Sequence, residues 1–313
     1  MHRIKKYGSL TTSLHPMLNP RVQPMTFQRL PDGLELDLMT DQEVRALRNW
    51  AVAEGWNPGI SDMDIARRYD PEAFIALRRG DELLGGGSIF SYEATCGFMG
   101  LFIMRKDLRQ RGLGNVLWQH RRNRLQGRLK ARAPIGMDGV LHMVPYYSRG
   151  GFDYFYEDVR FQGIASGEES PRCRTMNEED FNALVTLDTS CFPGDRSRFL
   201  KQWLAAPGVK TAVLKNSEGP QAFGALRPAE VGYKFGPVLA YSAAAAEETL
   251  SHLMSVVSGE QIQLDIPEVN TDAMAIAASF GLADVFRCAK MVLGEQPTLR
   301  TDRIFGLTSF EFG

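Results

Sequence analysis

The sequence of 313 residues has few of the features that mark several common protein classes. It contains only four cysteines, and no two form a CxxC pair, which argues against a zinc ribbon and a dense disulfide framework. No apolar run approaches the roughly 18 to 20 residues of a membrane span. No HExxH motif or Cys/His cluster occurs, so no metal site is expected. These absences favour a protein of the reducing cytoplasm that uses neither a metal nor a membrane.

The charge balance also excludes a class of partner. The 36 Lys and Arg residues are matched by 37 Asp and Glu residues, giving a net charge of −1 at pH 7. A chain of this kind has no long-range field to collect a polyanion, so nucleic acid is not an expected partner. Hydrophobic residues make up 44% of the chain, which is enough for real cores. At roughly 100 to 200 residues per domain, the length predicts two domains.

Changes in pattern divide the chain into three parts. Residues 1–24 are basic, hold three prolines and show few periodic apolar positions, so we expect a flexible arm. Residues 25–165 and 166–313 are the two expected domains, with a Gly-, Ser- and Glu-rich linker near 163–171. Strands and helices follow in a similar order in both. The sequence therefore predicts two copies of one α/β architecture with a mixed sheet.

Individual elements can be predicted from capping signals and hydrophobic runs. Thr40 followed by Glu43 forms a capping box for a helix. Residues 97–104 are apolar on both faces, which predicts a strand in the buried centre of a sheet. In the second half, Thr175 and Glu178 predict another capped helix.

The most informative stretch is LFIMRKDLRQRGLGNVLW, residues 101–118. Here the buried strand runs through an Arg-Gln-Arg-Gly-Leu-Gly turn directly into an amphipathic helix. The first N–H groups of a helix are unpaired and carry a partial positive charge. Gly112 and Gly114 have no side chains, so a pyrophosphate could approach those donors closely. The turn predicts an anion-binding cradle, and the alternative is that the two glycines only shape the turn.

Better-known nucleotide motifs do not fit this turn. The GxxxxGK loop followed by Ser or Thr is absent, and a GxGxxG fingerprint would need glycine at Leu117. These absences argue against a kinase and against a dehydrogenase. A nicotinamide-binding oxidoreductase that uses this turn, or the glycines at 85–87, is kept as an alternative.

The turn resembles the coenzyme A loop of the GNAT superfamily of N-acetyltransferases. The family pattern, Arg/Gln-x-x-Gly-x-Gly/Ala, is matched by Arg109, Gly112 and Gly114. The resemblance implies that acetyl-CoA is the co-substrate, held by this loop and by the splayed strand before it. The implied coenzyme A-binding residues are Phe102, Ile103, Met104, Arg109, Gln110, Arg111, Gly112, Leu113, Gly114 and Asn115.

A second match follows in YYSRGGF, which is similar to the Y-x-x-x-G-F turn that often closes the family's domain. It implies that Tyr147 protonates the departing thiolate, a task for which a phenol is suited because it is protonated at neutral pH. The alternatives are a core tyrosine with a satisfied hydroxyl, and Tyr146 as the acid. The asparagine that many members carry ahead of this helix is missing near 141–145.

An amine attacks a thioester only when neutral, so the reaction also needs a base. The candidates are Glu93 and Asp138, each at a strand end, and Asp62 in a turn; each could instead be a solvated or capping carboxylate. Trp56 could pack over an acceptor or close a core edge. For the 3′-phosphate of coenzyme A, Arg111 beside the cradle is preferred to the arginines of the helix.

The resemblance extends over the whole chain. GWNPG with Asp62, and the later segments YKFGPVLA, LDIPEVN, ASFGL and IFGLTSFEFG, are similar to a two-domain subgroup of the family. The second half lacks the glycine pattern, which implies a degenerate domain that forms a wall of the acceptor pocket.

These resemblances imply two tandem GNAT-like domains. The first is expected to move an acetyl group from acetyl-CoA to a primary amine of a small molecule or peptide, by direct attack in a ternary complex. A non-catalytic acyl-CoA-binding sensor is the alternative, and a monomer or homodimer is expected.

Overall fold

The computed structural model describes residues 27–313, so the arm expected at 1–24 lies outside the described residues. The strands are β1 (Phe27–Arg29), β2 (Leu34–Leu38), β3 (Phe74–Arg79), β4 (Glu82–Tyr92), β5 (Cys96–Met104), β6 (Ile135–Val140), β7 (Asp153–Ile164), β8 (Cys173–Arg174), β9 (Lys210–Asn216), β10 (Gly219–Pro228), β11 (Tyr233–Ala240), β12 (Gln261–Pro267), β13 (Ala283–Leu293) and β14 (Ile304–Gly306). The helices are α1 (Asp41–Ala53), α2 (Asp62–Tyr69), α3 (Leu113–Arg128), α4 (Val144–Arg149), α5 (Phe181–Cys191), α6 (Ser197–Leu204), α7 (Ala243–Ser255) and α8 (Thr271–Ser279).

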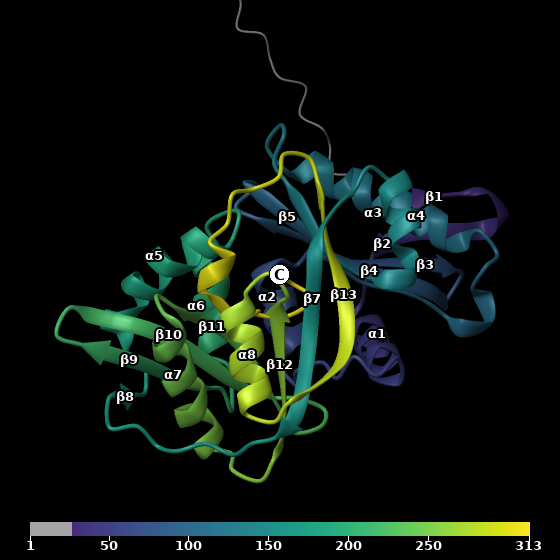
Figure 1. The fold of residues 1–313 in the computed structure, drawn as a ribbon. Coiled ribbons are helices and arrows are strands. Elements are labelled where there is room, and N and C mark those ends of the chain that lie inside the picture. Colours follow the sequence, from purple (N-terminus) through teal and green to yellow (C-terminus); the bar gives the residue numbers. More distant parts are fainter. Residues whose placement is uncertain (1–26) are drawn as a thin grey trace, which may run out of the picture.

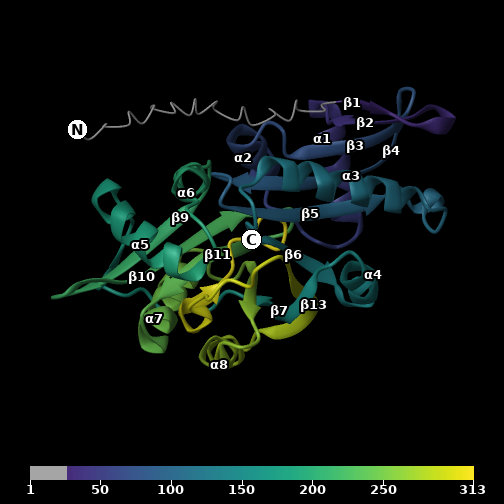
Figure 2. The same cartoon turned by 90° about the horizontal axis from the view of Figure 1, so that it is seen from above.

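These strands form one continuous mixed sheet across both halves of the chain. Its order is β1-β2-β3-β4-β5-β6-β13-β7-β12-β11-β10-β9-β8, and β14 pairs with β11 beside this path. Helices α3 and α4 pack against one face of the first half, while α1, α2 and α6 cover the other (Figures 1 and 2). In the second half, α7 and α8 pack on one side and α5 on the other. The predicted α/β class with a mixed sheet is confirmed.

Side-chain caps mark the start of α1 and of the short 3₁₀ turn, Glu178–Asp180, that leads into α5. Thr40 and Glu43 form the predicted box on α1, since the Thr40 hydroxyl accepts from the Glu43 N–H at 3.3 Å and the Glu43 carboxylate accepts from the Thr40 N–H at 2.7 Å. The box predicted at 175–178 is wrong by two residues. There Asn177 and Asp180 cap each other, and Asp180 also binds an arginine on the neighbouring strand, a partner that a sequence window does not show.

The two halves exchange strands. β13, from the second half, lies between β6 and β7 and pairs antiparallel with both. β7, the last strand of the first half, pairs on its other edge with β12 over Asp158–Ile164. Figure 1 shows β7 and β13 side by side in the foreground, although more than 100 positions separate them in sequence (β7 ends at 164, β13 begins at 283). The sheet therefore runs unbroken through the boundary expected at 165.

Each half contains one pair of parallel strands that diverge. β5 and β6 pair at two positions, Gly97 with Ile135 and Phe98 with Gly136, and then separate. β11 and β12 likewise pair at two positions. In the second half β14 fills the opening, because it pairs with β11 and the next N–H, that of Leu307, donates to the Asp265 carbonyl at 2.8 Å. In the first half the opening between β5 and β6 holds a pocket.

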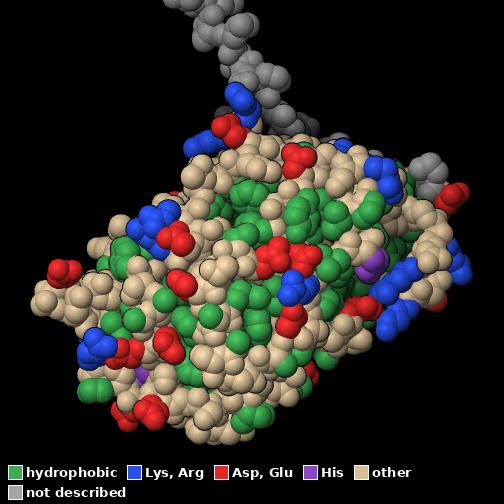
Figure 3. Space-filling model, in the orientation of Figure 1, with side chains coloured by type: hydrophobic (Ala, Val, Ile, Leu, Met, Phe, Trp, Pro, Cys, Tyr) green, Lys and Arg blue, Asp and Glu red, His purple; other side chains and the backbone are tan. Residues whose placement is uncertain are grey.

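The surface is mixed in character. On the face shown in Figure 3, acidic and basic side chains are interspersed with apolar ones, which agrees with the near-neutral net charge. Within residues 27–313, no helix combines the length and apolar character needed to cross a bilayer.

Candidate active site

A cleft of about 510 Å³, which we call the helix-start cleft, opens where β5 ends and α3 begins. Most of the predicted coenzyme A-binding residues line it: Phe102, Ile103, Met104, Arg109, Gln110, Gly112, Gly114 and Asn115. Two predicted residues do not. Arg111 is exposed beside the cleft, and Leu113 packs against the core under α3.

The backbone at the start of α3 has unused donors. Gly112 is the N-cap in the left-handed conformation, with φ of +81°, which a residue with a side chain adopts only at a cost. Within residues 27–313, no acceptor receives the N–H groups of residues 111–114, whereas the Asn115 N–H donates to the Gly112 carbonyl at 3.0 Å. Together with the helix dipole, these donors form the predicted anion cradle at the mouth of the cleft.

Arg109 has a different task from the one its motif position suggests. Its Nε donates to the Met104 carbonyl at 3.0 Å, and its Nη2 lies 2.7 Å from Glu54 at the end of α1. The side chain thus ties the loop to the end of β5 and to α1, and Glu54 balances its charge. The cradle therefore depends on backbone N–H groups more than on this guanidinium.

The cleft leads to a smaller pocket of about 70 Å³ between the diverging strands, which we call the splay pocket. Tyr147 lines both, so its side chain lies where they meet. Its ring stacks on Trp118 at 5.0 Å between centroids and fits against β6 because Gly139 has no side chain; a Cβ there would lie 2.6 Å from the ring. Burial raises the pKa of Tyr147, which keeps the hydroxyl protonated at neutral pH. Tyr146 lines only the outer cleft, and its hydroxyl donates to Asn115.

Asp138 reaches the splay pocket as part of a buried group of three charges. Lys290 on β13 places its Nζ 2.6 Å from Asp138 and 3.2 Å from Asp158 on β7. Burial raises the pKa of Asp138 well above its ordinary value, and the Asp158 carboxylate adds to this effect while Lys290 opposes it. Two carboxylates therefore share one ammonium, which favours retention of a proton by one of them.

This triad makes a prediction for pH. A carboxyl whose pKa is raised in the folded state stabilises the protein fully below its unfolded value of about 4, and that contribution is lost as the pH rises toward the folded value. Compared with Asp138→Asn, the unchanged protein should therefore lose stability as the pH rises, by up to about 1.4 kcal/mol per unit. Urea unfolding of both proteins between about pH 5 and 8 measures the difference. Parallel profiles would contradict the raised pKa.

The structure does not bring Glu93 to the site. Glu93 lies in the exposed turn between β4 and β5, at the end of β5 remote from the cleft, and pairs with Arg198 at 3.2 Å. Asp62 is also engaged elsewhere: it is buried, lies 3.0 Å from Arg227 and accepts the Gly59 N–H. The two ends of a strand look alike in sequence. The sequence pattern therefore could not show which end of β5 lies at the opening between β5 and β6.

Arg121 is a residue of the splay pocket that the sequence analysis did not single out. It lies on the arginine-rich helix α3, yet it is fully buried, and its Nη2 donates to the Ser88 and Gly100 carbonyls at 2.6 Å each. The available signal was the row of glycines at 85–87 in β4. A Cβ on Gly87 would lie 2.4 Å from the Arg121 guanidinium carbon, so the glycine makes room for it. These glycines lie within a strand, which does not fit a nucleotide-binding turn.

The second half closes one side of the splay pocket. Residues 307–313, which we call the tail segment, leave β14 and cross onto the first half near the centre of the molecule (Figure 1). The Tyr92 hydroxyl donates to the Phe312 carbonyl at 2.7 Å, and the buried Phe312 ring meets Phe90 at 4.9 Å. Glu311 lines the splay pocket together with Trp56. The tail segment thus forms part of the wall of the splay pocket, and its location could not be derived from its sequence.

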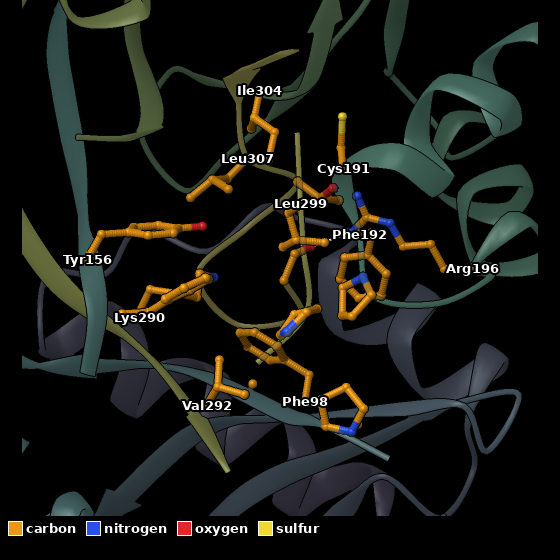
Figure 4. Close-up of a pocket in the computed structure, with 18 of the residues that line it drawn as sticks. Phe98, Tyr156, Cys191, Phe192, Arg196, Lys290, Val292, Leu299, Ile304 and Leu307 are labelled. Carbon is orange, nitrogen blue, oxygen red and sulfur yellow. Dashed lines mark hydrogen bonds between the residues drawn. The ribbon is translucent and has the colours of Figure 1, made fainter. Parts of the chain in front are cut away.

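A third hollow of about 60 Å³ lies between the halves. Figure 4 shows Tyr156 and Lys290 entering it from one side and Phe192 and Arg196 from the other. Its walls are mainly apolar, and Leu307 of the tail segment is one of them. Because Lys290 lines this hollow while its partner Asp138 lines the splay pocket, their ion pair stands between the two.

Comparisons with known proteins show similarity to acyltransferases. Residues 184–306 match the family model of an acetyltransferase (GNAT) domain. The chain is 23% identical over 275 residues to holothin acyltransferase of Pseudoalteromonas sp. (strain SANK 73390), covering 87% of this chain and 92% of that protein.

Solved structures agree on the fold. An acetyltransferase-like protein of Pyrococcus horikoshii superposes with a TM-score of 0.79 at 22% identity, over 91% of this chain and 98% of that one. A tandem GNAT protein from the clavulanic acid biosynthesis pathway gives 0.60 at 14% identity, over 84% and 99%. The second half therefore resembles a GNAT domain in sequence, and the whole chain shares the fold of a tandem GNAT protein. The family model matches the second half, whose opening β14 fills, while the open cleft lies in the first.

Proposed function

We propose that the first half transfers an acetyl group from acetyl-CoA to a primary amine of a small molecule or peptide. One observation carries the proposal: backbone N–H groups without acceptors, at residues 111–114, stand at the mouth of a cleft that leads between two diverging strands. The spacing of donors and opening suits a ligand with a diphosphate at one end and a reactive thioester at the other.

Each part of the cleft would then bind one part of acetyl-CoA. The diphosphate would accept hydrogen bonds at the start of α3. The pantetheine arm would lie along Phe102–Met104. One edge of this part of β5 faces β4, and the other edge is open because β6 pairs with β5 only as far as Phe98. Arg111 is exposed beside the cradle and is the proposed partner of the 3′-phosphate.

The thioester would lie beside Tyr147. When the amine attacks, the carbon–sulfur bond breaks and the sulfur needs a proton. Tyr147 is suited to supply it, because burial keeps its hydroxyl protonated and its side chain lines the junction of cleft and pocket.

The proposal is tested by binding and turnover together. Calorimetry should show that acetyl-CoA binds with one site per chain, and thiol release should rise when a primary amine from a library is added. Binding without turnover on any amine would instead favour an acyl-CoA sensor. Absence of binding would contradict both, and preferential binding of NAD(P) would revive the oxidoreductase alternative.

Tyr147→Phe is expected to lower kcat by about 100-fold, the usual contribution of a general acid, while the acetyl-CoA affinity stays within about twofold. The ring and its packing on Trp118 remain, so only the proton is lost. The matched control is Tyr146→Phe, which removes a hydroxyl bonded to Asn115 outside the splay pocket. Steady-state kinetics and calorimetry provide the two values. Unchanged turnover in the Tyr147 variant across the pH range would exclude this residue as the acid.

A further inference from the structure

Glu311 of the tail segment has a buried carboxylate oxygen to which no described residue donates a hydrogen bond. Its side chain is only 4% exposed, and it lines the splay pocket. Its Oε2 has no hydrogen-bond partner within residues 27–313. Only its backbone is tied down there, with the N–H donating to the Ser309 hydroxyl at 3.1 Å. A buried carboxylate in this condition costs free energy unless a donor arrives.

The tail segment brings this carboxylate to the beginning of the splay. A Cβ on Gly100 would lie 2.2 Å from the Glu311 carbonyl oxygen, so the tail segment crosses β5 directly at that glycine. The next residue, Leu101, has a φ of +51°, which interrupts the regular strand as it leaves β6. Glu311 and Tyr147 therefore line one pocket from different halves of the chain.

Two buried cations lie near Glu311. Arg160 makes two contacts of 2.7 Å with Asp265, and the buried Lys234 lies 3.8 Å from the same carboxylate. Two cations thus share one nearby carboxylate, and Glu311 interacts electrostatically with both cations.

Asp138, the other carboxylate in this pocket, is already engaged. Lys290 lies 2.6 Å from it, and burial favours its protonated form. An incoming ammonium would have to compete with Lys290 at Asp138, whereas no hydrogen-bond donor within residues 27–313 occupies the Oε2 of Glu311.

This inference rests on the proposed function. We propose that Glu311 binds the acceptor as an ammonium ion and then removes one of its protons, which makes the nitrogen nucleophilic. The substrate class is thus a primary amine that is protonated in solution and small enough at its reacting end to enter the splay pocket. The second half of the chain then contributes a catalytic residue to the site of the first.

The proton transfers balance. The ammonium gives one proton to the Glu311 carboxylate, and the nitrogen lone pair forms the bond to the acyl carbon of the acyl-CoA. The carbon–sulfur bond breaks with its electron pair on sulfur, which takes the proton of the Tyr147 hydroxyl. The second proton lost by the nitrogen passes through solvent to restore Tyr147, and Glu311 releases its proton to solvent.

The test uses the full chain with acetyl-CoA and an amine that the unchanged protein acetylates. Glu311→Gln keeps the shape but loses the charge, and should lower kcat/KM for the amine by at least about 100-fold while the acetyl-CoA affinity stays within about twofold. Glu311→Asp retains a carboxylate one methylene further back and should recover part of the loss. The matched control is Glu157→Gln on the surface of β7, which pairs with Arg287 and should retain full activity.

The outcomes separate this inference from the proposed function. If the unchanged protein acetylates no amine, the proposed function fails. If the unchanged protein acetylates an amine and the kcat/KM of Glu311→Gln for that amine is within about threefold of the unchanged value, the role of Glu311 is overturned while the proposed function stands. Loss of acetyl-CoA binding in both Glu311 variants would also overturn it, because the residue would then be structural. If the Gln variant fails to fold, the Asp variant still tests the role of Glu311. A fall in its kcat/KM for the amine at unchanged acetyl-CoA affinity supports that role, and an unchanged kcat/KM overturns it.

Discussion

Replacing Gly112 with glutamate is expected to weaken acetyl-CoA binding by more than about 100-fold, because a carboxylate would stand where the diphosphate must approach the helix start. Nothing lies within 4 Å of a Cβ built on Gly112, so the new side chain would extend into open space beside the cradle and not into the core. Its charge repels the ligand and competes for the same N–H groups. Isothermal titration calorimetry with acetyl-CoA measures the effect.

Backbone strain must be separated from charge in this experiment. Gly112 has a φ of +81°, and a side chain in that conformation costs about 1–2 kcal/mol. Gly259, before β12, offers a matched control: its φ is +85° and its Cβ would also meet nothing within 4 Å. Gly259→Glu should therefore have a similar stability cost and bind acetyl-CoA normally.

Gly112→Ala completes the series, since it introduces the strain without the charge and should lose far less affinity than the glutamate variant. If Gly112→Glu bound acetyl-CoA as tightly as Gly259→Glu, the cradle would not be where the diphosphate lies, and the assignment of the helix-start cleft would be wrong.

The sequence could predict what depends on neighbouring residues. The strand, turn and helix of 101–118 are adjacent in the chain, so their pattern indicated both the cradle and the buried strand, and the structure places them as expected. Tyr147 was reached for the same reason, because its turn is a compact local motif. Both halves also follow the order of elements that the pattern predicted.

What the sequence could not predict depends on distant contacts. Glu311 enters the pocket only because the tail segment, after filling the opening between β11 and β12, crosses to the first half. Asp138 is perturbed by Lys290, which reaches it only through the insertion of β13 beside β6. No local pattern encodes either pairing. The burial of Arg121 is equally hidden, because it depends on a glycine in another strand.

Strand exchange leads to the second large expected effect: the halves should not fold separately when the chain is cut at 165/166. Alone, residues 25–165 would leave β7 without either of its neighbours, because β12 and β13 both belong to the second half. Residues 166–313 would lose both partners of β13 and expose Phe312, which is fully buried in the intact chain.

Two buried ion pairs strengthen this expectation. Arg227 with Asp62, at 3.0 Å, and Arg160 with Asp265, at 2.7 Å, each join the two halves, and all four side chains are at most 3% exposed. Removing one partner of such a pair leaves an uncompensated buried charge and costs about 3–5 kcal/mol. Two such losses together match much of the stability of a typical domain, about 5–15 kcal/mol.

The measurement compares three preparations: each fragment alone, and the two fragments co-expressed. Each fragment alone should lack a cooperative unfolding transition and should not bind acetyl-CoA. The co-expressed pair should co-purify and bind acetyl-CoA, because the cut lies in a connection outside the strands, after β7 ends at Ile164. The co-expressed pair is also the control for the cut itself. If residues 25–165 folded alone and bound acetyl-CoA as the intact chain does, the first half would not depend on β13 and the tail segment. The argument that the second half completes the site would then fail as well.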